Sequence, residues 1–381
     1  MITIDDVADA NALYEAFRLS KKGVAWKASV QRYEMNVLRN INGSKKTIEA
    51  GESPVQGFNE FIIHERGKTR HVKSVHIRER VVQRSLCDNA LVPLLSKGLE
   101  YDNSASQKGK GLHFTINRLD KHLHRYYRKH GSNEGYVLLI DFKGYYDNIS
   151  HNKVYERLDR KVPDDGVRHL ACQLVEPFDD GNGKSLGIGS QISQIIAIDY
   201  NSEIDRLIKH ELGIESHSHY MDDFALIHES KDYLWYCLEK ITEKCNELGI
   251  KINPRKTQIV KLSHGFTFLK LRWTLTNTGK VLKRPNKDSI TRERRKLHKF
   301  KEKLDTGEIT MPIIAEQYSS WKGDKVKRKR ESHKPHQVRL NCYYTIKRMD
   351  QLYNELFINN QEGGPQNDGQ TKVPYRKHAL R

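Results

Sequence analysis

A nine-residue stretch, HYMDDFALI at residues 219–227, constrains the fold of this chain most strongly. It places the adjacent acids Asp222 and Asp223 between two apolar flanks, a pattern that predicts a strand, a tight turn and a second strand. Aspartates are common in turns because their side chains bond to nearby backbone, and this ordinary role is one interpretation of the pair. A chemical role requires a further carboxylate, on another strand, that shares a cation with these two.

A third acid follows an apolar run earlier in the chain. The segment GYVLLIDFKGYYDNISH predicts a short buried strand that breaks at Asp141 into a turn and a helix. If this strand lies beside the 219–227 hairpin in one sheet, three carboxylates meet at one edge. Their mutual repulsion favours a bound cation, and oxygen ligands favour a hard ion such as Mg²⁺. Two such ions clamp the attacking and leaving oxygens of a phosphoryl displacement, so the three acids indicate nucleotidyl transfer.

The charge of the chain indicates a polyanionic partner. Its 381 residues include 66 Lys and Arg against 48 Asp and Glu, a formal net charge of +18. Such an excess attracts nucleic acid, although a merely soluble basic protein is the alternative. The basic residues gather in a predicted helix at 118–130 and a run at 322–334. We expect both to contact the phosphates of template and primer.

Composition also limits location and class. No run approaches the roughly 18 apolar residues that a membrane span needs. The acidic, amphipathic N-terminal segment argues against a signal or transit peptide. Five cysteines without a CxxC pair fit a reducing compartment and predict no zinc site. We therefore expect a cytoplasmic protein that does not contact a membrane.

Six segments, in their order along the chain, resemble blocks of bacterial reverse transcriptases of the retron and group II intron kind. They are ERGKTRHVKSVHIRERVVQ, NSASQKGKGLH, LLIDFKGYYDNISH, YMDD, LGIKINPRKTQIV and GFTFLKLRW. The resemblance covers about residues 55–357 and implies RNA-templated synthesis of cDNA with two Mg²⁺ ions. It also implies an α+β, right-hand polymerase fold with fingers, a palm built on an antiparallel sheet backed by helices, and a helical thumb.

The same resemblance implies a division of the chain into domains. Residues 1–135 become N-terminal helices and fingers, and residues 136–275 become a palm with an inserted fingers segment around 152–185. Residues 276–358 become a thumb lengthened by the basic run. The tail, 359–381, has a composition typical of disorder.

Roles for individual residues follow from the resemblance. Asp141, Asp222 and Asp223 become the catalytic and metal-binding acids, with the backbone carbonyl of Phe142 as a neutral ligand. Tyr146 excludes a 2′-hydroxyl and so selects dNTPs over rNTPs. The other residues expected to contact the dNTP are Lys68, Arg70, Gln194 and Lys256, the last either as a general acid toward pyrophosphate or as a phosphate contact. Those expected to contact primer or template are Gln83, Lys108, Lys110, Gly189, Tyr220, Met221, Phe268, Lys270, Lys327 and Arg328.

One block departs from the common pattern of the family. Most relatives carry Q-G-x-x-x-S-P, whereas residues 188–194 read I-G-x-x-x-S-Q. This form is similar to that of diversity-generating retroelement enzymes, which copy a template RNA with errors directed at adenine. The resemblance then implies a variable target gene and a small basic accessory protein as partners. Gln194 in place of Pro changes a contact near the templating base, and sequence drift without loss of fidelity is the alternative.

Other hypotheses remain open. A phage-defence reverse transcriptase, acting with a structured non-coding RNA or a toxin, is a second biological role. A non-catalytic, RNA-binding maturase-like protein does not require three acids facing phosphates, and an RNA-synthesising polymerase does not require an aromatic side chain at Tyr146. The acids and Tyr146 therefore favour a reverse transcriptase.

Overall fold

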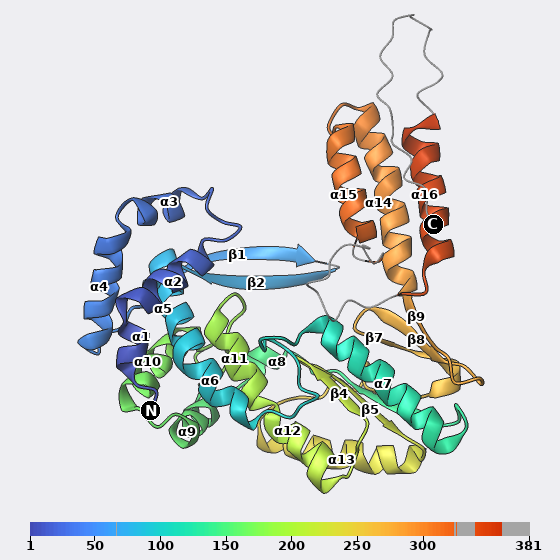
Figure 1. Cartoon of the computed structure of the whole chain (residues 1–381), viewed down its shortest axis with the longest axis horizontal. Helices are drawn as coiled ribbons and strands as arrows, with labels where there is room; N and C mark the ends of the chain where they lie inside the picture. Colours follow the sequence, from blue (N-terminus) through green and yellow to red (C-terminus); the bar gives the residue numbers. More distant parts are fainter. Residues whose placement is uncertain (66, 324, 326–339, 360–381) are drawn as a thin grey trace, which may run out of the picture. The chain divides into compact units, whose positions relative to one another are not determined.

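The computed structural model describes residues 1–65, 67–323, 325 and 340–359. Among these residues the chain forms two compact units, of which the first runs from Met1 to Leu282 and the second begins at Lys283 (Figure 1). The predicted basic run is therefore described only at its start, and the predicted tail almost entirely falls outside the described residues, as do Lys327 and Arg328.

The N-terminal part of the first unit is helical, as the spacing of its apolar residues predicts. Its helices are α1 (Ile4–Ala8), α2 (Ala10–Ser20), α3 (Ala28–Met35), α4 (Val37–Glu49), α5 (Ile77–Leu86) and α6 (Val92–Leu95), with a π-helical turn, Cys87–Leu91, joining the last two. Asp9 begins α2, because its carboxylate accepts hydrogen bonds from the backbone amides of Asn11 and Ala12. The helix then packs on α5 and buries Leu13 and Phe17.

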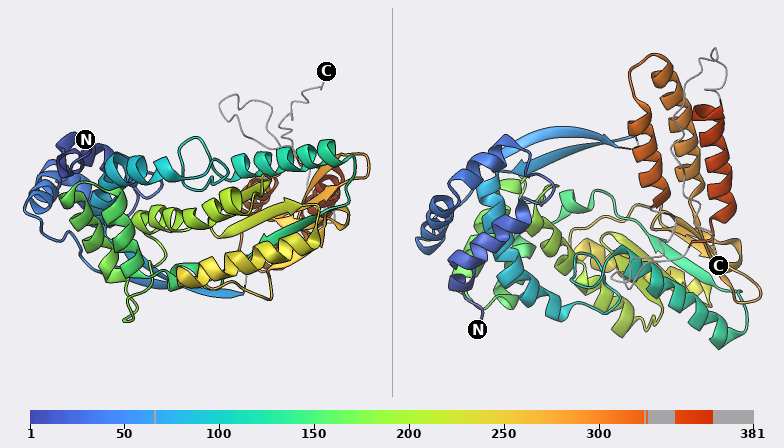
Figure 2. Two further views of the ribbon diagram at one scale, coloured as in Figure 1. Left: turned by 90° about the horizontal axis from the view of Figure 1, so that it is seen from below. Right: turned by 45° about the horizontal axis from the view of Figure 1, so that its top comes forward.

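A long antiparallel hairpin lies between α4 and α5. It consists of β1 (Phe58–Glu65) and β2 (Lys68–Val75), paired in register along their whole length. Gly67 stands in its turn with a φ of +74°, which glycine adopts without steric cost. The predicted hairpin is thus confirmed, and both views in Figure 2 show it extending from the N-terminal helices.

The central sheet of the first unit carries the candidate site. Its four strands lie in the order β4–β5–β3–β6, and each neighbouring pair is antiparallel. They are β3 (Tyr136–Ile140), β4 (His217–Tyr220), β5 (Asp223–His228) and β6 (Gln258–Lys261). Two helices, α7 (Leu112–His130) and α13 (Lys231–Glu247), pack against it, α7 on β4 and β5 and α13 on β3 and β5. The predicted α+β fold, with an antiparallel sheet backed by helices, is confirmed.

Five further helices connect β3 to β4. They are α8 (Tyr145–Asn148), α9 (His151–Lys161), α10 (Asp165–Val175), α11 (Gln191–Tyr200) and α12 (Ser202–Arg206), the last continued by a π-helical turn, Leu207–Glu211. Helix α10 contacts α1 and α5, so this part of the chain lies against the N-terminal helices. A buried ion pair fixes α9 to α11, because Arg157 Nε lies 2.9 Å from Oδ2 of Asp199.

A small three-stranded sheet follows, and the boundary between the two units falls within its last strand. Its strands, β7 (Phe266–Phe268), β8 (Leu271–Leu275) and β9 (Val281–Pro285), lie in sequence order. The predicted strand pair around GFTFLKLRW is β7 and β8, and the indole nitrogen of the fully buried Trp273 donates to the carbonyl of Phe268 at 3.1 Å. Strand β9 extends to Pro285 and the next helix begins at Lys287. The predicted thumb, from residue 276, therefore begins with part of this sheet rather than with a helix.

The second unit is a set of helices around its own small core. The helices described are α14 (Lys287–Asp305), α15 (Met311–Gly323) and α16 (Tyr343–Phe357). Five buried side chains form the core: Leu297, Ile314, Tyr318, Met349 and Phe357. Asp350 of α16 accepts hydrogen bonds from Lys322 at 2.7 Å and from the hydroxyl of Tyr318 at 2.8 Å, which ties α16 to α15.

Candidate active site

The β4–β5 hairpin presents the paired acids at its tip. Tyr220 and Asp223 are the last paired residues, so Met221 and Asp222 form a two-residue turn, as the sequence predicts. Met221 has a φ of +58°, a left-handed conformation that costs a residue with a side chain about 1–2 kcal/mol. Its carbonyl oxygen accepts a hydrogen bond from Nδ2 of Asn201 at 3.0 Å, which helps to offset this strain.

Strand register brings the third acid to the same end of the sheet. Strands β3 and β5 pair from Tyr136 with His228 to Ile140 with Phe224. The next positions in this register are Asp141 and Asp223, and Asp222 precedes Asp223 in the turn. Burial, together with the charges of Asp222 and Asp141, raises the pKa of Asp223 to about 7.

A loop that follows α13 surrounds Asp141. The backbone amide of Asn253 donates to the carbonyl of Asp141 at 2.7 Å, and its side-chain amide donates to Oδ2 at 3.0 Å. Thr257 Oγ1 accepts from the backbone amide of Asp141 at 3.3 Å, and the ammonium of Lys256 lies 3.3 Å from each carboxylate oxygen. The sequence placed Lys256 near the site but missed Asn253 and Thr257, although both stand within the same quoted block.

The carboxylate oxygens of Asp141, Asp222 and Asp223 are suitable ligands for a hard divalent ion, although the three carboxylates do not meet at one point. Within the described ranges, no group of three or more His, Cys, Asp or Glu side chains lies close enough to hold a metal ion. The predicted convergence of the carboxylates is therefore incomplete in this structure, in which Lys256 and Asn253 contact the carboxylate of Asp141. The oxygen-only ligands, the raised pKa of Asp223 and the ammonium at Asp141 all mark a place where positive charge is stabilised.

The residues after Asp141 lead into the site. Phe142 is buried and its ring packs against that of Phe224, with centroids 5.8 Å apart. Tyr146 is partly buried, and burial followed by the charge of Asp222 raises its pKa, which keeps its hydroxyl neutral. The charge of Asp222 thus acts on Tyr146. The functions of the Phe142 carbonyl and of Tyr146 stay predictions.

The side chain of Gln83 is used within the protein. It is buried (1% exposed), its amide nitrogen donates to Glu79 at 3.0 Å, and its carbonyl accepts from Ser190 Oγ at 2.7 Å. Gln83 therefore positions the 188–194 segment, and its predicted contact with primer or template stays a prediction. Gly189 in that segment has a φ of +119° and lies on β2, where an added Cβ would meet the carbonyl oxygen of Lys73 at 3.1 Å.

Two other predicted nucleic-acid contacts are used inside the protein. The ammonium of Lys110 donates to the carbonyls of Tyr101 and Asn103 at 3.0 and 3.1 Å, and burial lowers its pKa. It therefore holds its own loop together, whereas Lys108 is exposed. Phe268 is buried (5% exposed), so it supports β7 from within the sheet.

The remaining predicted residues lie on exposed turns and strands. Arg70 is exposed on β2; Lys68 opens the same strand, and its side chain is not among those described. Lys270 is exposed and follows Leu269 in the turn between β7 and β8, with φ values of +63° and +50°. Relatives usually have Gly at this position. The left-handed conformation of Lys270 explains that preference, since glycine adopts this conformation without strain.

A pocket of about 510 Å³ lies between α5 and α11. Gln194, the exposed residue of α11, lines it together with Arg80, Arg84, Gly189 and Ser106. The pocket thus combines cationic and amide groups from the N-terminal helices with the 188–194 segment. Its volume lies within the usual range of ligand pockets.

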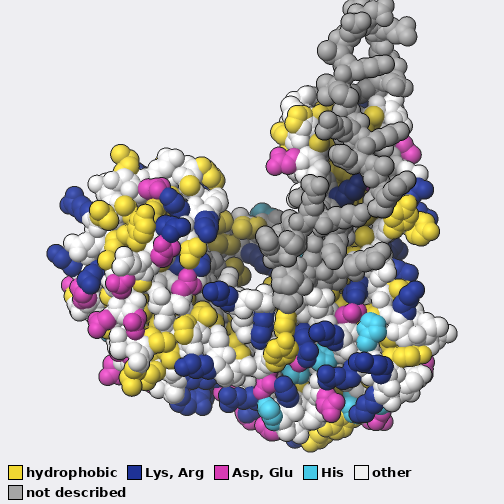
Figure 3. Space-filling view, in the orientation of Figure 1, with side chains coloured by type: hydrophobic (Ala, Val, Ile, Leu, Met, Phe, Trp, Pro, Cys, Tyr) yellow, Lys and Arg dark blue, Asp and Glu magenta, His cyan; other side chains and the backbone are white. Residues whose placement is uncertain are grey.

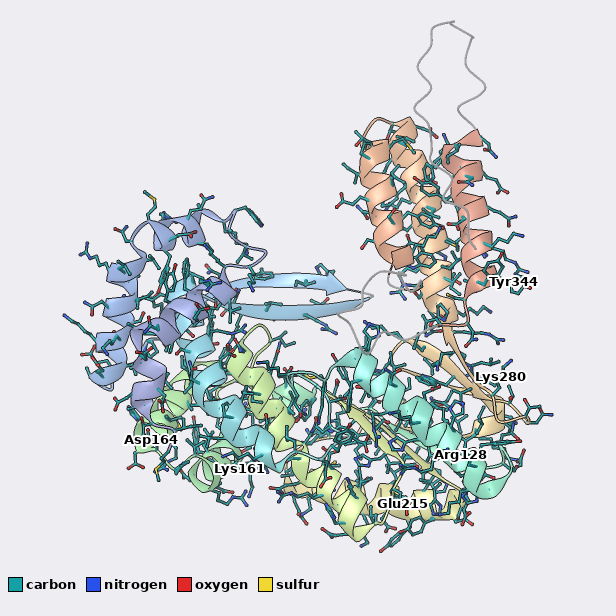
Figure 4. The ribbon with its side chains drawn as sticks, in the orientation of Figure 1. Arg128, Lys161, Asp164, Glu215, Lys280 and Tyr344 are labelled. Carbon is teal, nitrogen blue, oxygen red and sulfur yellow. The ribbon has the colours of Figure 1, made fainter. Side chains whose placement is uncertain are left out.

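A basic surface covers α7, as the sequence predicts. Its exposed cationic residues are Lys121, Arg125, Arg128 and Lys129. Figure 3 shows dark blue Lys and Arg side chains over this region, and Figure 4 labels Arg128 near the end of the helix. Among the described residues, no helix is both long and apolar enough to cross a membrane.

Acids at the ends of neighbouring antiparallel strands define the catalytic arrangement of a nucleotidyltransferase. Residues 61–273 match the family model described as reverse transcriptase (RNA-dependent DNA polymerase). The match spans more than half of the 381 residues and includes all three acids, so the chain belongs to this family. The predicted enzyme class, RNA-directed DNA polymerase, is confirmed by this membership.

Comparisons with individual proteins add the following likenesses. Telomerase from Candida albicans, solved with a fragment of telomeric RNA, is 12% identical with a TM-score of 0.45, over 65% of this chain and 49% of that chain. Apo telomerase from Candida tropicalis is 16% identical with a TM-score of 0.44, over 59% of this chain and 48% of that chain. A form truncated from its C-terminal domain is 14% identical with a TM-score of 0.46, over 65% and 60%. The chain thus spans about half the length of the first two. No curated protein sequence matches it significantly.

Proposed function

We propose that this protein copies an RNA template into cDNA by nucleotidyl transfer, with Asp141, Asp222 and Asp223 as its catalytic acids. The single observation that carries the proposal is the register of β3 and β5, which sets Asp141 and Asp223 at one end of the sheet beside Asp222. The raised pKa of Asp223 supports it, because clustered carboxylates are useful where a cation completes them.

Two Mg²⁺ ions fit this proposal. The carboxylates of Asp141, Asp222 and Asp223 and the carbonyl of Phe142 would hold them. Bound there, Mg²⁺ would supply positive charge that stabilises the transferring phosphate. The protein itself fixes the carboxylates, Asp141 through Asn253 and Asp222 through the hairpin turn.

The nucleotide would lie between the acids and the basic hairpin. Arg70 and Lys68, from β2, would contact its triphosphate, and Lys256 would leave Asp141 to donate to the same phosphates. Tyr146 would lie under its sugar and exclude a 2′-hydroxyl. Tyr220 and Met221 would contact the primer end from the hairpin tip.

Template contacts would come from the pocket and its surroundings. Gln194 and Gly189 line the pocket of about 510 Å³, where we place the templating nucleotide. Lys108 and the cationic face of α7 would contact phosphates, together with Lys270 on its turn, and such contacts weaken steeply with salt. We also retain the division into fingers (1–135), palm (136–275), thumb (276–358) and tail (359–381), with a fingers segment around 152–185.

We assign the biological role to a diversity-generating retroelement, on the I-G-x-x-x-S-Q form of residues 188–194. That role implies a template RNA, a small basic accessory protein and a cytoplasmic location. Phage defence, with a structured non-coding RNA, is the second candidate. The exposure of Gln194 in the pocket between α5 and α11 favours the first, because a polar amide there relaxes the fit of the templating base.

The test is primer extension on an RNA template with Mg²⁺, comparing dNTPs with rNTPs and sequencing the products. We expect DNA synthesis, with errors concentrated opposite template adenine. A Gln194→Ala variant should extend the primer but shift the error spectrum. A Gln173→Ala variant, changed at a partly exposed glutamine of α10 that donates to the carbonyl of Gly51, is the matched control. Synthesis with rNTPs alone would overturn the proposed polymerase type, and errors spread evenly over the four template bases would favour the defence role.

A further inference from the structure

Two side chains hold the carbonyl oxygen of Met221, the residue before Asp222. Asn201 Nδ2 lies 3.0 Å from this oxygen and His219 Nε2 lies 2.6 Å from it. The same planar peptide group carries the amide of Asp222, so fixing the oxygen fixes the direction in which Asp222 leaves the turn. With a φ of +58°, Met221 needs such support to stay in this conformation.

A buried carboxylate anchors His219 on its other side. Its Nδ1 lies 2.8 Å from Oδ2 of Asp205 in α12, and Nδ2 of Asn103 donates to the same oxygen at 3.0 Å. His219, Asp205 and Asn103 are fully buried. The ring of His219 also stacks on Phe224, with centroids 3.8 Å apart, so packing prevents it from turning away.

The atoms that face the two ring nitrogens of His219 are both hydrogen-bond acceptors. One is a carboxylate oxygen of Asp205 and the other is the carbonyl oxygen of Met221. Burial opposes the ionisation of Asp205, but His219 and His217 outweigh it and lower its pKa to about 2. The Asp205 carboxylate therefore stays an acceptor for the histidine ring inside the protein.

The same strand is also held from its outer edge. The backbone amide of His219 donates to the carbonyl of Asp102 at 3.2 Å, and its carbonyl accepts from the amide of Ser104 at 3.3 Å. The loop that carries Lys108 and Lys110 therefore continues directly from the residues that border β4. Asn103, in this border, donates to Asp205, so loop, helix and hairpin meet at one buried carboxylate.

We propose that His219, anchored by Asp205, is a positioning residue for nucleotidyl transfer, which together with Asn201 holds the Met221–Asp222 peptide so that the Asp222 and Asp223 carboxylates face Asp141. The catalytic consequence rests on the proposed function. The positioning itself does not, and it can be measured separately.

His217 provides a matched control on the same strand. It is also fully buried and faces Asp205, but its Nε2 lies 3.6 Å from Oδ1 and its ring does not contact Met221. A His217→Gln variant therefore disturbs the same buried cluster while leaving the Met221 carbonyl held. A His219→Gln variant places an amide oxygen opposite either the Asp205 carboxylate or the Met221 carbonyl, both of which are acceptors. In the double variant, Asp205→Asn with His219→Gln, the new asparagine amide can donate to that glutamine oxygen.

The experiment follows hydrogen exchange of the 219–225 segment in the full chain, together with kcat and KM for the dNTP in primer extension. We expect His219→Gln to speed exchange in this segment and to lower kcat by roughly 100-fold with KM nearly unchanged, because small misplacements of catalytic groups cost about that much. His217→Gln should retain the slow exchange and the kcat of the unmutated protein, even if its melting temperature falls as far as that of His219→Gln. The double variant should regain part of the kcat that His219→Gln loses.

Unchanged exchange in the 219–225 segment of His219→Gln would overturn the positioning role. Equal loss of kcat in His219→Gln and His217→Gln would do so too, because it would mean that only general stability had changed. If the unmutated protein fails to extend primers while the exchange contrast holds, the proposed function is wrong and the positioning inference stands.

Discussion

The ammonium group of Lys256 lies 3.3 Å from both carboxylate oxygens of Asp141. The lysine side chain is half exposed, whereas Asn253 holds the acid from the other side. A half-exposed cation thus contacts an acid that Asn253 also holds, and it competes for the oxygens that a metal ion would use. The contact places Lys256 where it can pass between the acid and a triphosphate.

Replacing Lys256 by Ala should separate its competition with a metal ion at Asp141 from its contact with the triphosphate. The apparent affinity of the free protein for Mg²⁺ should rise, because a competitor is lost. The rate of nucleotide addition should fall by about 100-fold, in the range expected for removing a group that donates a proton or binds phosphate. Calorimetric Mg²⁺ titration and single-turnover extension measure both, with Lys251→Ala, an exposed change in the same loop, as control. Unchanged rates would refute a role for Lys256 in the reaction.

The stability of the metal-free protein should depend on pH through Asp223. Its folded-state pKa is about 7 against an ordinary value of 3.8, so the protonated side chain is favoured in the folded state. This contribution is complete below pH 3.8 and is lost as the pH rises through about 7. In urea unfolding with a chelator, the stability of the unmutated protein relative to Asp223→Asn should therefore decline from pH 4 to pH 8, a roughly chosen window around these values. If the stability difference between the unmutated protein and Asp223→Asn did not change with pH, this would contradict the raised pKa of Asp223.

The turn between β7 and β8 predicts a stabilising substitution. Lys270 has a φ of +63° and is exposed, so Lys270→Gly removes steric strain without losing buried contacts. We expect a gain of about 1 kcal/mol in the free energy of unfolding. Thr267→Gly, at the exposed position of strand β7, should instead lower the free energy of unfolding, because glycine weakens a strand. Losses in both variants would show that the turn is not strained at Lys270.

Tyr146 should control the choice of sugar. Its ring lies close enough to Asp222 for that charge to raise its pKa, so a nucleotide held at the acids would meet it. Tyr146→Ala should raise the use of rNTPs relative to dNTPs by at least about tenfold, measured as the ratio of kcat/KM values. Tyr155→Ala, on α9, is the control for loss of a tyrosine elsewhere. An unchanged ratio would remove Tyr146 from the sugar site.

The sequence predicts the strands that carry the three acids because strand patterns are local. The apolar run before Asp141 and the paired acids between apolar flanks define β3 and the β4–β5 hairpin, and register then aligns Asp141 with Asp223. The side-chain partners could not be predicted in the same way. Gln83 looks available in sequence, but Glu79 and Ser190, which occupy its amide, depend on packing between distant segments.

The contacts of buried polar residues could not be predicted from the sequence either. His219 stands beside the acids in the sequence, yet its partner Asp205 lies in α12 and Asn103 in a loop far earlier in the chain. No periodicity reports such a contact, because a histidine on a strand is compatible with many surroundings. Lys110 was misassigned for the same reason, since carbonyls of its own loop bind its ammonium group.

The most direct measurement is RNA-templated primer extension by the unmutated protein and by Asp222→Asn and Asp223→Asn variants, with RNA binding measured in parallel. The account predicts DNA synthesis that requires Mg²⁺, loss of synthesis in both variants, and RNA affinity within about threefold of the unmutated protein, because the acids do not contact template phosphates. Synthesis that persists at the unmutated rate in Asp222→Asn would contradict the assignment of the β3–β5 strand ends as the catalytic centre.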